Sequence, residues 1–202
     1  MTIRAILIDL DGVLRHWPRP WNAAADPGQR RVEDAVFAVA FAPELLQWAI
    51  TGVITHDEWL AETIARLSTD WPGDDARRAA AVWADSIPSI DPAVRDLVRE
   101  WRRRVPVALI TNATRRLRRD LAVVGLDESF DAIVNSSEVG RAKPDPAIFY
   151  AALVRMDTSA GETIFIDDSA ANVEAALALG LLGYRFDGDI DRLREFVSGY
   201  LG

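Results

Sequence analysis

The chain has 202 residues, 50% of them hydrophobic and 27% charged, which is enough apolar material for one compact core with a sizeable insertion. This composition excludes a disordered tail and a fibrous protein. Because the chain has no cysteine, it has no disulfide framework, thiolate metal site or cysteine nucleophile. The net charge of -8 disfavours broad binding to nucleic acid or to anionic membranes. No stretch reaches the roughly 18 consecutive apolar residues of a membrane helix, so we expect a cytoplasmic location.

The first apolar run, residues 4–8, predicts a strand buried on both faces. The following stretch, residues 15–90, has no convincing strand and is expected to be helical throughout. Within it, Thr55 and Glu58 have the spacing of a capping box at a helix start, and Asp74 is expected to cap the Ala-rich helix that follows.

Beyond residue 90, apolar runs alternate with patterns in which apolar residues recur at i, i+3, i+4 and i+7, as on the buried face of a helix. This alternation predicts an α/β fold with a doubly wound parallel sheet. We expect a Rossmann-like core, residues 1–14 and 91–202, with a helical cap, residues 15–90, inserted after the first strand. The later runs cover residues 105–110, 131–134, 163–166 and 182–186.

Polar residues follow the predicted strands directly or lie in the loop after the third apolar run, residues 131–134. Ligands of an open parallel sheet bind beyond the carboxyl ends of its strands, so we expect these side chains to converge there. They are Asp9, Asp11, Thr111, Asn112, Lys143, Asp167 and Asp168.

Taken one at a time, these residues also fit structural roles. The aspartates could form turns or cap helices, Thr111 and Asn112 could cap the helix that carries Leu117, and Lys143 could be an ordinary surface lysine. Their coincidence at successive strand ends is much less expected by chance. Such a cluster of negative charge is also costly unless a cation is present.

Mg²⁺ meets this requirement, because it is a hard ion that binds carboxylates, waters and phosphate oxygens. With Asp9, Asp167 and Asp168 ionised, the charges of Mg²⁺ and Lys143 balance theirs only if Asp11 is protonated. A protonated Asp11 is what a general acid needs.

Four segments resemble the ordered motifs of the haloacid dehalogenase-like (HAD) hydrolase superfamily. They follow the order and spacing of the superfamily and together span nearly the whole predicted core. The helical insertion resembles the superfamily's cap of the first type. The segments are DLDGVL at 9–14, ITNAT at 110–114, GRAKPDPAIF at 140–149 and IDDSAANVEAA at 166–176.

This resemblance implies a role for each of five residues. Asp9 would attack phosphorus and form an aspartyl-phosphate, and Asp11 would protonate the leaving oxygen and then deprotonate the attacking water. Thr111 and the backbone N–H of Asn112 would hold the phosphoryl oxygens. Lys143 would offset the charge of both nucleophile and phosphate.

The resemblance also implies a Mg²⁺ site. The carboxylate of Asp9, the backbone carbonyl of Asp11 and the carboxylate of Asp168 would bind the ion, while Asp167 would act through a metal-bound water. Asn172, one helical turn beyond Asp168, would either tether this loop or face solvent.

The resemblance implies that Asp11 favours phosphorus over carbon as the atom attacked. The dehalogenases of the superfamily, which attack carbon, do not keep an aspartate two residues after the nucleophile. We therefore expect a Mg²⁺-dependent phosphatase that acts on a small phosphorylated metabolite. One alternative is a phosphotransferase or sugar-phosphate mutase, in which the phosphoryl group passes to a substrate hydroxyl. The other is a protein that binds a phospho-ligand or partner without turnover.

The helical cap is expected to select the substrate. Trp17 and Trp21 follow the first motif closely and could line the mouth of a pocket. Arg15, His16 and Arg19 share that stretch and could meet an anionic or polar substrate, although each also fits an ordinary surface or hinge role.

Other features of the sequence are interpreted as structural. His56, in the first turn of its helix, is expected to face solvent, and the apolar segment from Val36 to Phe41 packs within the cap or against another subunit, which leaves the oligomeric state open. A solvated helix face accounts for four arginines. They are Arg115, Arg116, Arg118 and Arg119.

Overall fold

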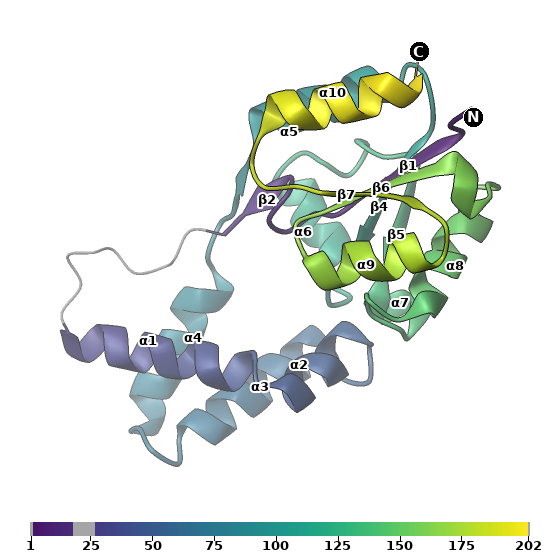
Figure 1. Ribbon diagram of the computed structural model, residues 1–202. Coiled ribbons are helices and arrows are strands. Elements are labelled where there is room, and N and C mark those ends of the chain that lie inside the picture. The colour runs from purple at the N-terminus through teal and green to yellow at the C-terminus, as the bar shows by residue number, and fades with distance from the viewer. Residues whose placement is uncertain (1, 18–26, 202) are drawn as a thin grey trace.

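The computed structural model describes residues 2–17 and 27–201, and its centre is a five-stranded sheet (Figure 1). The strand order is β5-β4-β1-β6-β7, and every pair of neighbours is parallel. The predicted doubly wound α/β fold is confirmed, and each predicted apolar run overlaps a strand. The strands are β1 (Ala5–Ile8), β4 (Val107–Thr111), β5 (Ala132–Asn135), β6 (Thr163–Asp167) and β7 (Leu182–Arg185).

Helices cover both faces of the sheet (Figure 1). Successive strand residues point to opposite faces, so Ile6 and Ile8 share a buried cluster with α5, α6 and α10, whereas Leu7 shares one with α8 and α9. Burial on both faces explains why the three central strands, β4, β1 and β6, are largely apolar. The helices are α5 (Pro92–Trp101), α6 (Leu117–Val123), α7 (Ser136–Val139), α8 (Pro146–Arg155), α9 (Ala170–Ala178) and α10 (Ile190–Leu201), with a 3₁₀ turn at Ala160–Glu162.

The helical cap lies beside the sheet and contains four helices with buried clusters of their own (Figure 1). Val36 and Ala40 are fully buried in these clusters, so the segment from Val36 to Phe41 packs within the cap, as one of the two interpretations expected. The four helices are α1 (Pro27–Ala40), α2 (Pro43–Ile50), α3 (His56–Leu67) and α4 (Gly73–Ala84).

The expectation that residues 15–90 contain no strand is wrong at both ends of that stretch. β2 (Arg15–His16) and β3 (Ser89–Ile90) pair antiparallel, where the chain enters and leaves the helical cap. Strands of two residues are too short to show a periodic pattern, so sequence periodicity could not reveal them.

The two predicted helix caps have different outcomes. Thr55 and Glu58 form the expected capping box, in which the side chain of each accepts from the backbone N–H of the other. The prediction for Asp74 is wrong, because α4 begins one residue earlier, at Gly73, after Pro72. Asp74 instead pairs with Arg77 in the first turn.

The end of α2 rests directly on α7 of the core. Ser136 Oγ donates to the carbonyl of Ile50 at 2.5 Å. Beyond α2, Gly52 has a φ of +73°, and a Cβ there would lie 2.4 Å from the carbonyl oxygen of Ser137. Only glycine fits this contact, so the position of the cap on the core is partly built into the backbone.

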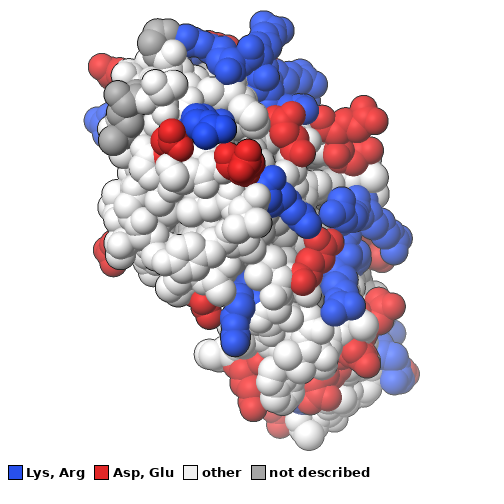
Figure 2. Space-filling model, turned by 90° about the vertical axis from the view of Figure 1, so that its right-hand side faces the viewer, with Lys and Arg blue, Asp and Glu red and all other residues white. Residues whose placement is uncertain are grey.

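Charged side chains are spread over the surface rather than separated by sign. Figure 2 shows basic and acidic groups interleaved over one face, next to a broad uncharged area. No helix within residues 2–17 and 27–201 has the length and hydropathy needed to cross a membrane.

The capping box predicts a measurable loss of stability on removal of one hydroxyl. Thr55→Ala should lower the free energy of unfolding by about 1 kcal/mol, because the N–H of Glu58 loses its acceptor. Thr55→Ser, which keeps the hydroxyl, is the control. Urea unfolding curves that coincide for the alanine and serine variants would contradict this role.

Candidate active site at the carboxyl edge of the sheet

Three of the predicted polar groups lie at adjacent strand ends. Asp9 follows β1 directly, Thr111 is the last residue of β4, and Asp167 is the last residue of β6. β4 and β6 are the two neighbours of β1 in the sheet, so parallel pairing brings these ends to one edge. Lys143 reaches the same edge from the loop between α7 and α8.

The ammonium group of Lys143 lies at the centre of this site. Its Nζ atom is 2.7 Å from Asp9 Oδ1, 2.7 Å from Asp167 Oδ2 and 2.9 Å from the carbonyl oxygen of Ile110. Burial by itself would lower the pKa of Lys143, but the charges of Asp9 and Asp167 outweigh it and raise that pKa above its ordinary value. Lys143 is therefore a buried cation, and the alternative of a surface lysine is wrong.

The carboxylates of Asp9, Asp167 and Asp168 form an acidic cluster, in which one oxygen of each lies within 4.8 Å of the others. Burial raises the pKa of Asp9 to about 7, and the charge of Asp167 adds to this while Lys143 opposes it. Burial and the charge of Asp167 likewise raise the pKa of Asp168. A bound cation would relieve this resistance of Asp9 and Asp168 to ionisation.

This cluster fits Mg²⁺ by its chemistry, since the donors are hard carboxylate oxygens. The backbone is also shaped around it. Gly12 has a φ of +82°, and a Cβ at this position would lie 2.2 Å from Asp168 Oδ2. The missing side chain of Gly12 thus leaves the space that the Asp168 carboxylate occupies.

Asp167 is held from several sides. Besides Lys143, the amide Nδ2 of Asn172 donates to it at 3.0 Å, and the backbone N–H of Ser169 donates to Oδ1 at 2.8 Å. Asn172 is only 9% exposed, so its tethering role is confirmed and the solvent-facing alternative is wrong.

Asn112 binds the loop that carries Lys143. Its Oδ1 accepts from the N–H of Lys143 at 2.7 Å, and its Nδ2 donates to the carbonyl of Lys143 at 2.9 Å. The idea that Thr111 and Asn112 cap α6 is wrong, since Arg116 precedes that helix. Sequence reasoning missed this use of the Asn112 side chain, because contacts between distant loops leave no local pattern.

Asp11 is engaged by two residues that follow it in the chain. Arg15 Nε lies 2.7 Å from Asp11 Oδ1 and Nη2 lies 2.8 Å from Oδ2, while Trp17 Nε1 donates to Oδ1 at 2.8 Å. Arg15 is only 4% exposed and its guanidinium lies 4.7 Å from the Trp17 ring centre, so the alternative of an ordinary surface residue is wrong.

The pairing of Arg15 with Asp11 changes the charge balance from which a protonated Asp11 was expected. That balance left out Arg15. With Arg15 included, the four positive charges of Mg²⁺, Lys143 and Arg15 equal the four negative charges of fully ionised aspartates. Asp11 accepts three hydrogen bonds, two from Arg15 and one from Trp17, and both of its carboxyl oxygens take part. Nη1 of Arg15 is buried with no hydrogen-bond partner among the described residues, so the pairing with Asp11 must offset the cost of burying this guanidinium.

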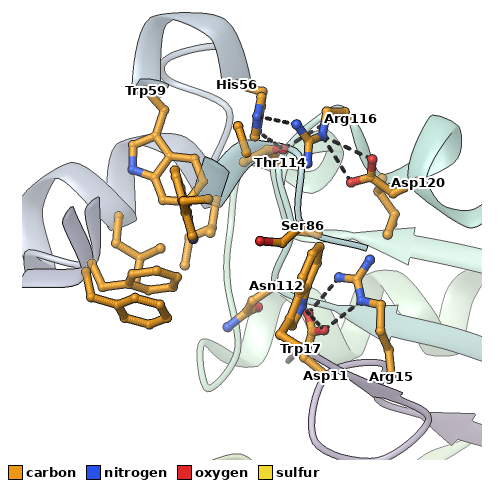
Figure 3. Close-up of a pocket in the computed structure, with 18 residues that line it drawn as sticks. Asp11, Arg15, Trp17, His56, Trp59, Ser86, Asn112, Thr114, Arg116 and Asp120 are labelled. Carbon is orange, nitrogen blue, oxygen red and sulfur yellow. Dashed lines mark hydrogen bonds and ion pairs between the residues drawn. The ribbon is translucent and has the colours of Figure 1, made fainter. Parts of the chain in front are cut away.

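A pocket of about 470 Å³ opens between the helical cap and this edge of the core (Figure 3). The cap contributes aromatic and aliphatic side chains, among them Phe37, Phe41 and Trp59. The core side includes Asp11 and Asn112, so the pocket adjoins the strand-end residues. Trp17 also lines it, as one interpretation of the sequence expected.

His56 and Arg116 correct two further expectations. His56 is half-buried in this pocket, with Nδ1 at 3.2 Å from Thr114 Oγ1 and Nε2 at 2.7 Å from Nη1 of Arg116 (Figure 3). Arg116, expected on a solvated face, also pairs with Asp120 at 3.0 Å. The other three arginines of that run are exposed. A contact between α3 and α6 depends on how the cap sits on the core, which helical periodicity does not encode.

The remaining candidates do not reach the site or lie outside the described residues. His16 is exposed, 3.9 Å from Asp91. Arg19 and Trp21 lie outside the described residues, so their expected roles stay untested.

Comparison with known proteins gives a family for this arrangement. A family model described as haloacid dehalogenase-like hydrolase matches residues 3–180. The chain therefore belongs to the haloacid dehalogenase-like hydrolase family, as the resemblance of the four segments implied, and it is an enzyme of the hydrolase class.

Two curated relatives are named as phosphatases. The chain is 28% identical to ribulose-1,5-bisphosphate 5-phosphatase from Halopiger xanaduensis, over 91% of this chain and 84% of that protein. It is 29% identical to phosphoglycolate phosphatase from Pectobacterium atrosepticum, over 88% of this chain and 77% of the relative.

A HAD family enzyme from Bacteroides thetaiotaomicron, solved in complex with magnesium and inorganic phosphate, has a similar fold. The TM-score is 0.68 at 23% identity, over 93% of this chain and 96% of that structure.

The contact between Gly12 and Asp168 predicts a specific defect in metal binding. Gly12→Ala should weaken Mg²⁺ binding about ten-fold or more, because the new Cβ would displace the Asp168 carboxylate. Gly125→Ala is a matched control, since its φ of +69° imposes similar strain with nothing within 4 Å of the new atom. Equal Mg²⁺ affinities of the two variants in calorimetry would rule out the steric explanation.

The partial burial of His56 predicts that the stability of the protein depends on pH. Burial, followed by the charge of Arg116, lowers the pKa of His56 below its ordinary value of 6.5. As the pH falls, His56 is therefore protonated in the unfolded chain before it is protonated in the folded protein. The stability contributed by neutral His56 is lost as the pH falls below about 6.5. In melting curves from pH 8 to pH 5, His56→Gln should flatten this decline and His16→Gln should not. An unchanged decline in His56→Gln would exclude this origin.

Proposed function

We propose that this protein is a Mg²⁺-dependent phosphatase that hydrolyses a small phosphorylated metabolite through an aspartyl-phosphate on Asp9. The observation that carries the proposal is the contact of one buried lysine, Lys143, with both Asp9 and Asp167, next to Asp168. The names of the phosphatase relatives support phosphate ester hydrolysis.

In the first step, a carboxylate oxygen of Asp9 attacks phosphorus and the bond from phosphorus to the ester oxygen breaks. Leu10 N–H and Lys143 both contact Oδ1 of Asp9, which favours Oδ2 as the attacking atom. Asp11 protonates the departing alcohol, which requires that it first gain a proton despite its present contacts with Arg15 and Trp17. Its position at the pocket supports this role.

In the second step, Asp11 takes a proton from a water molecule, which attacks phosphorus and releases inorganic phosphate and free Asp9. The hydroxyl of Thr111 and the backbone N–H of Asn112 would hold the phosphoryl oxygens, while Lys143 offsets their charge. Mg²⁺, held by the Asp9 and Asp168 carboxylates and the Asp11 carbonyl, with Asp167 acting through water, would supply further positive charge at those oxygens.

The chain organisation and location belong to the same proposal. We propose a catalytic core of residues 1–14 and 91–202 and a helical cap of residues 15–90, which the pairing of β2 with β3 near both junctions supports. We further propose that the enzyme works in the cytoplasm on a small molecule and not on nucleic acid or membranes, in keeping with its net charge of -8.

Phosphate release from a panel of phosphorylated metabolites and an aryl phosphate tests the proposal. Wild type should release phosphate with Mg²⁺, stop in EDTA and recover when Mg²⁺ returns. Asp9→Asn should lower the rate by about three orders of magnitude or more, because an amide cannot attack phosphorus. Asp11→Asn should slow both formation and breakdown of the intermediate. Asp127→Asn, an exposed aspartate, is the control.

Release that occurs only when an acceptor alcohol is added would favour the phosphotransferase or mutase. Full activity of Asp9→Asn, or of the metal-free protein, would contradict the proposal.

A further inference from the structure

The pocket wall formed by the helical cap is unusually apolar for a site beside so many charges. Phe37 and Phe41 are each 41% exposed although both lie on α1, a helix whose Val36 and Ala40 are fully buried. Both rings line the pocket, where Trp17, 42% exposed, also lies. Large rings left uncovered around a cavity mark a surface that binds an apolar group.

The aromatic side chains hold one another in place. The rings of Phe37 and Phe41 stack with centres 4.7 Å apart. Phe41 meets Trp59 and Trp83 edge to face at 5.9 and 6.0 Å, and the two tryptophans are 5.0 Å apart. Trp59 Nε1 donates to the carbonyl of Ala40 at 2.9 Å, which fixes the ring on the cap. The apolar wall is thus preformed and needs no ordering when a ligand binds.

The charged side chains in the pocket are already paired with one another. Arg15 pairs with Asp11, and Arg116 pairs with Asp120 (Figure 3). With these pairs formed, the lining has no excess positive charge for a second phosphate or a carboxylate on the substrate.

The uncharged polar side chains are engaged as well. Thr114 Oγ1 contacts His56, and the Asn112 amide binds the backbone of Lys143. Ser86 Oγ donates to the carbonyl of Val82 at 3.1 Å. A sugar or polyol in this pocket would have to compete with these existing contacts for its hydrogen bonds, which disfavours it.

From these observations we propose that the preferred substrates are monophosphate esters of hydrophobic alcohols or phenols, with the apolar body held between the aromatic wall and Asp11. This inference rests on the proposed phosphatase function and specifies the substrate of that same site. A cavity of about 470 Å³ lies within the range that encloses drug-sized ligands. A body of two or three carbon atoms would leave most of the aromatic surface in contact with water.

A homologous series of n-alkyl phosphates, from ethyl to octyl, tests this proposal, because their ester oxygens have nearly the same reactivity. The value of kcat/KM for wild type should rise about four-fold for each added methylene until the pocket is filled. Octyl phosphate should exceed a hexose phosphate by at least about ten-fold.

Substitutions in the wall supply the control. Phe41→Ser should reduce the dependence on chain length, and Phe37→Ser, at the outer end of the stack, provides the same test if the loss of Phe41 unfolds the cap. Tyr150→Ser, which removes an exposed ring on α8 outside the pocket, should leave the dependence unchanged.

Binding of alkyl phosphonates to Asp9→Asn separates this inference from the phosphatase proposal, since it needs no turnover. Affinity that rises with chain length supports the apolar site even if no ester is hydrolysed. The absence of hydrolysis would then overturn only the phosphatase proposal. A flat series, or preference for hexose phosphates, overturns the apolar site while the phosphatase stands. No binding and no phosphate release would overturn both.

Discussion

The ammonium group of Lys143 lies between two carboxylates at the ends of neighbouring strands, which would otherwise repel each other. It lies 2.7 Å from both Asp9 after β1 and Asp167 at the end of β6, with all three groups buried. Removing one partner of such a buried pair leaves an uncompensated charge, which costs about 3–5 kcal/mol. Asn112 and Asn172 fix the two sides of this bridge through the Lys143 backbone and the Asp167 carboxylate. The position of the proposed nucleophile therefore depends on a lysine more than a hundred residues away along the chain.

The cap completes a site that the core only begins. The strand ends supply charge, whereas the helices of the cap supply Phe37, Phe41 and the tryptophans that enclose the pocket. Asp11, two residues after Asp9, lines the pocket between the strand ends and the cap. In the proposed reaction, the phosphoryl group would lie among the charged residues at the strand ends and the departing alcohol on the side of the cap.

The sequence indicated the sheet and the strand-end residues because both leave local signals. Uninterrupted apolar runs mark strands buried on both faces, and polar residues directly after them must fall at one edge. It did not reveal the two-residue strands at the cap, the buried pairing of Arg15 with Asp11, or the contact of His56 with Arg116. These features depend on how α3 packs against the start of α6 and on how the chain enters the cap. Helical spacing alone does not distinguish a half-buried arginine from a solvated one.

The account depends most on covalent transfer of the phosphoryl group to Asp9. Rapid acid quench of the Mg²⁺-loaded enzyme during turnover of an aryl phosphate, followed by mass spectrometry of its peptides, tests this step directly. The account predicts a phosphoryl group on the peptide that contains Asp9, enriched in Asp11→Asn if breakdown is slowed more than formation, and absent in Asp9→Asn. Turnover of the same ester with no phosphorylated peptide, or with the phosphoryl group on another residue, would contradict it.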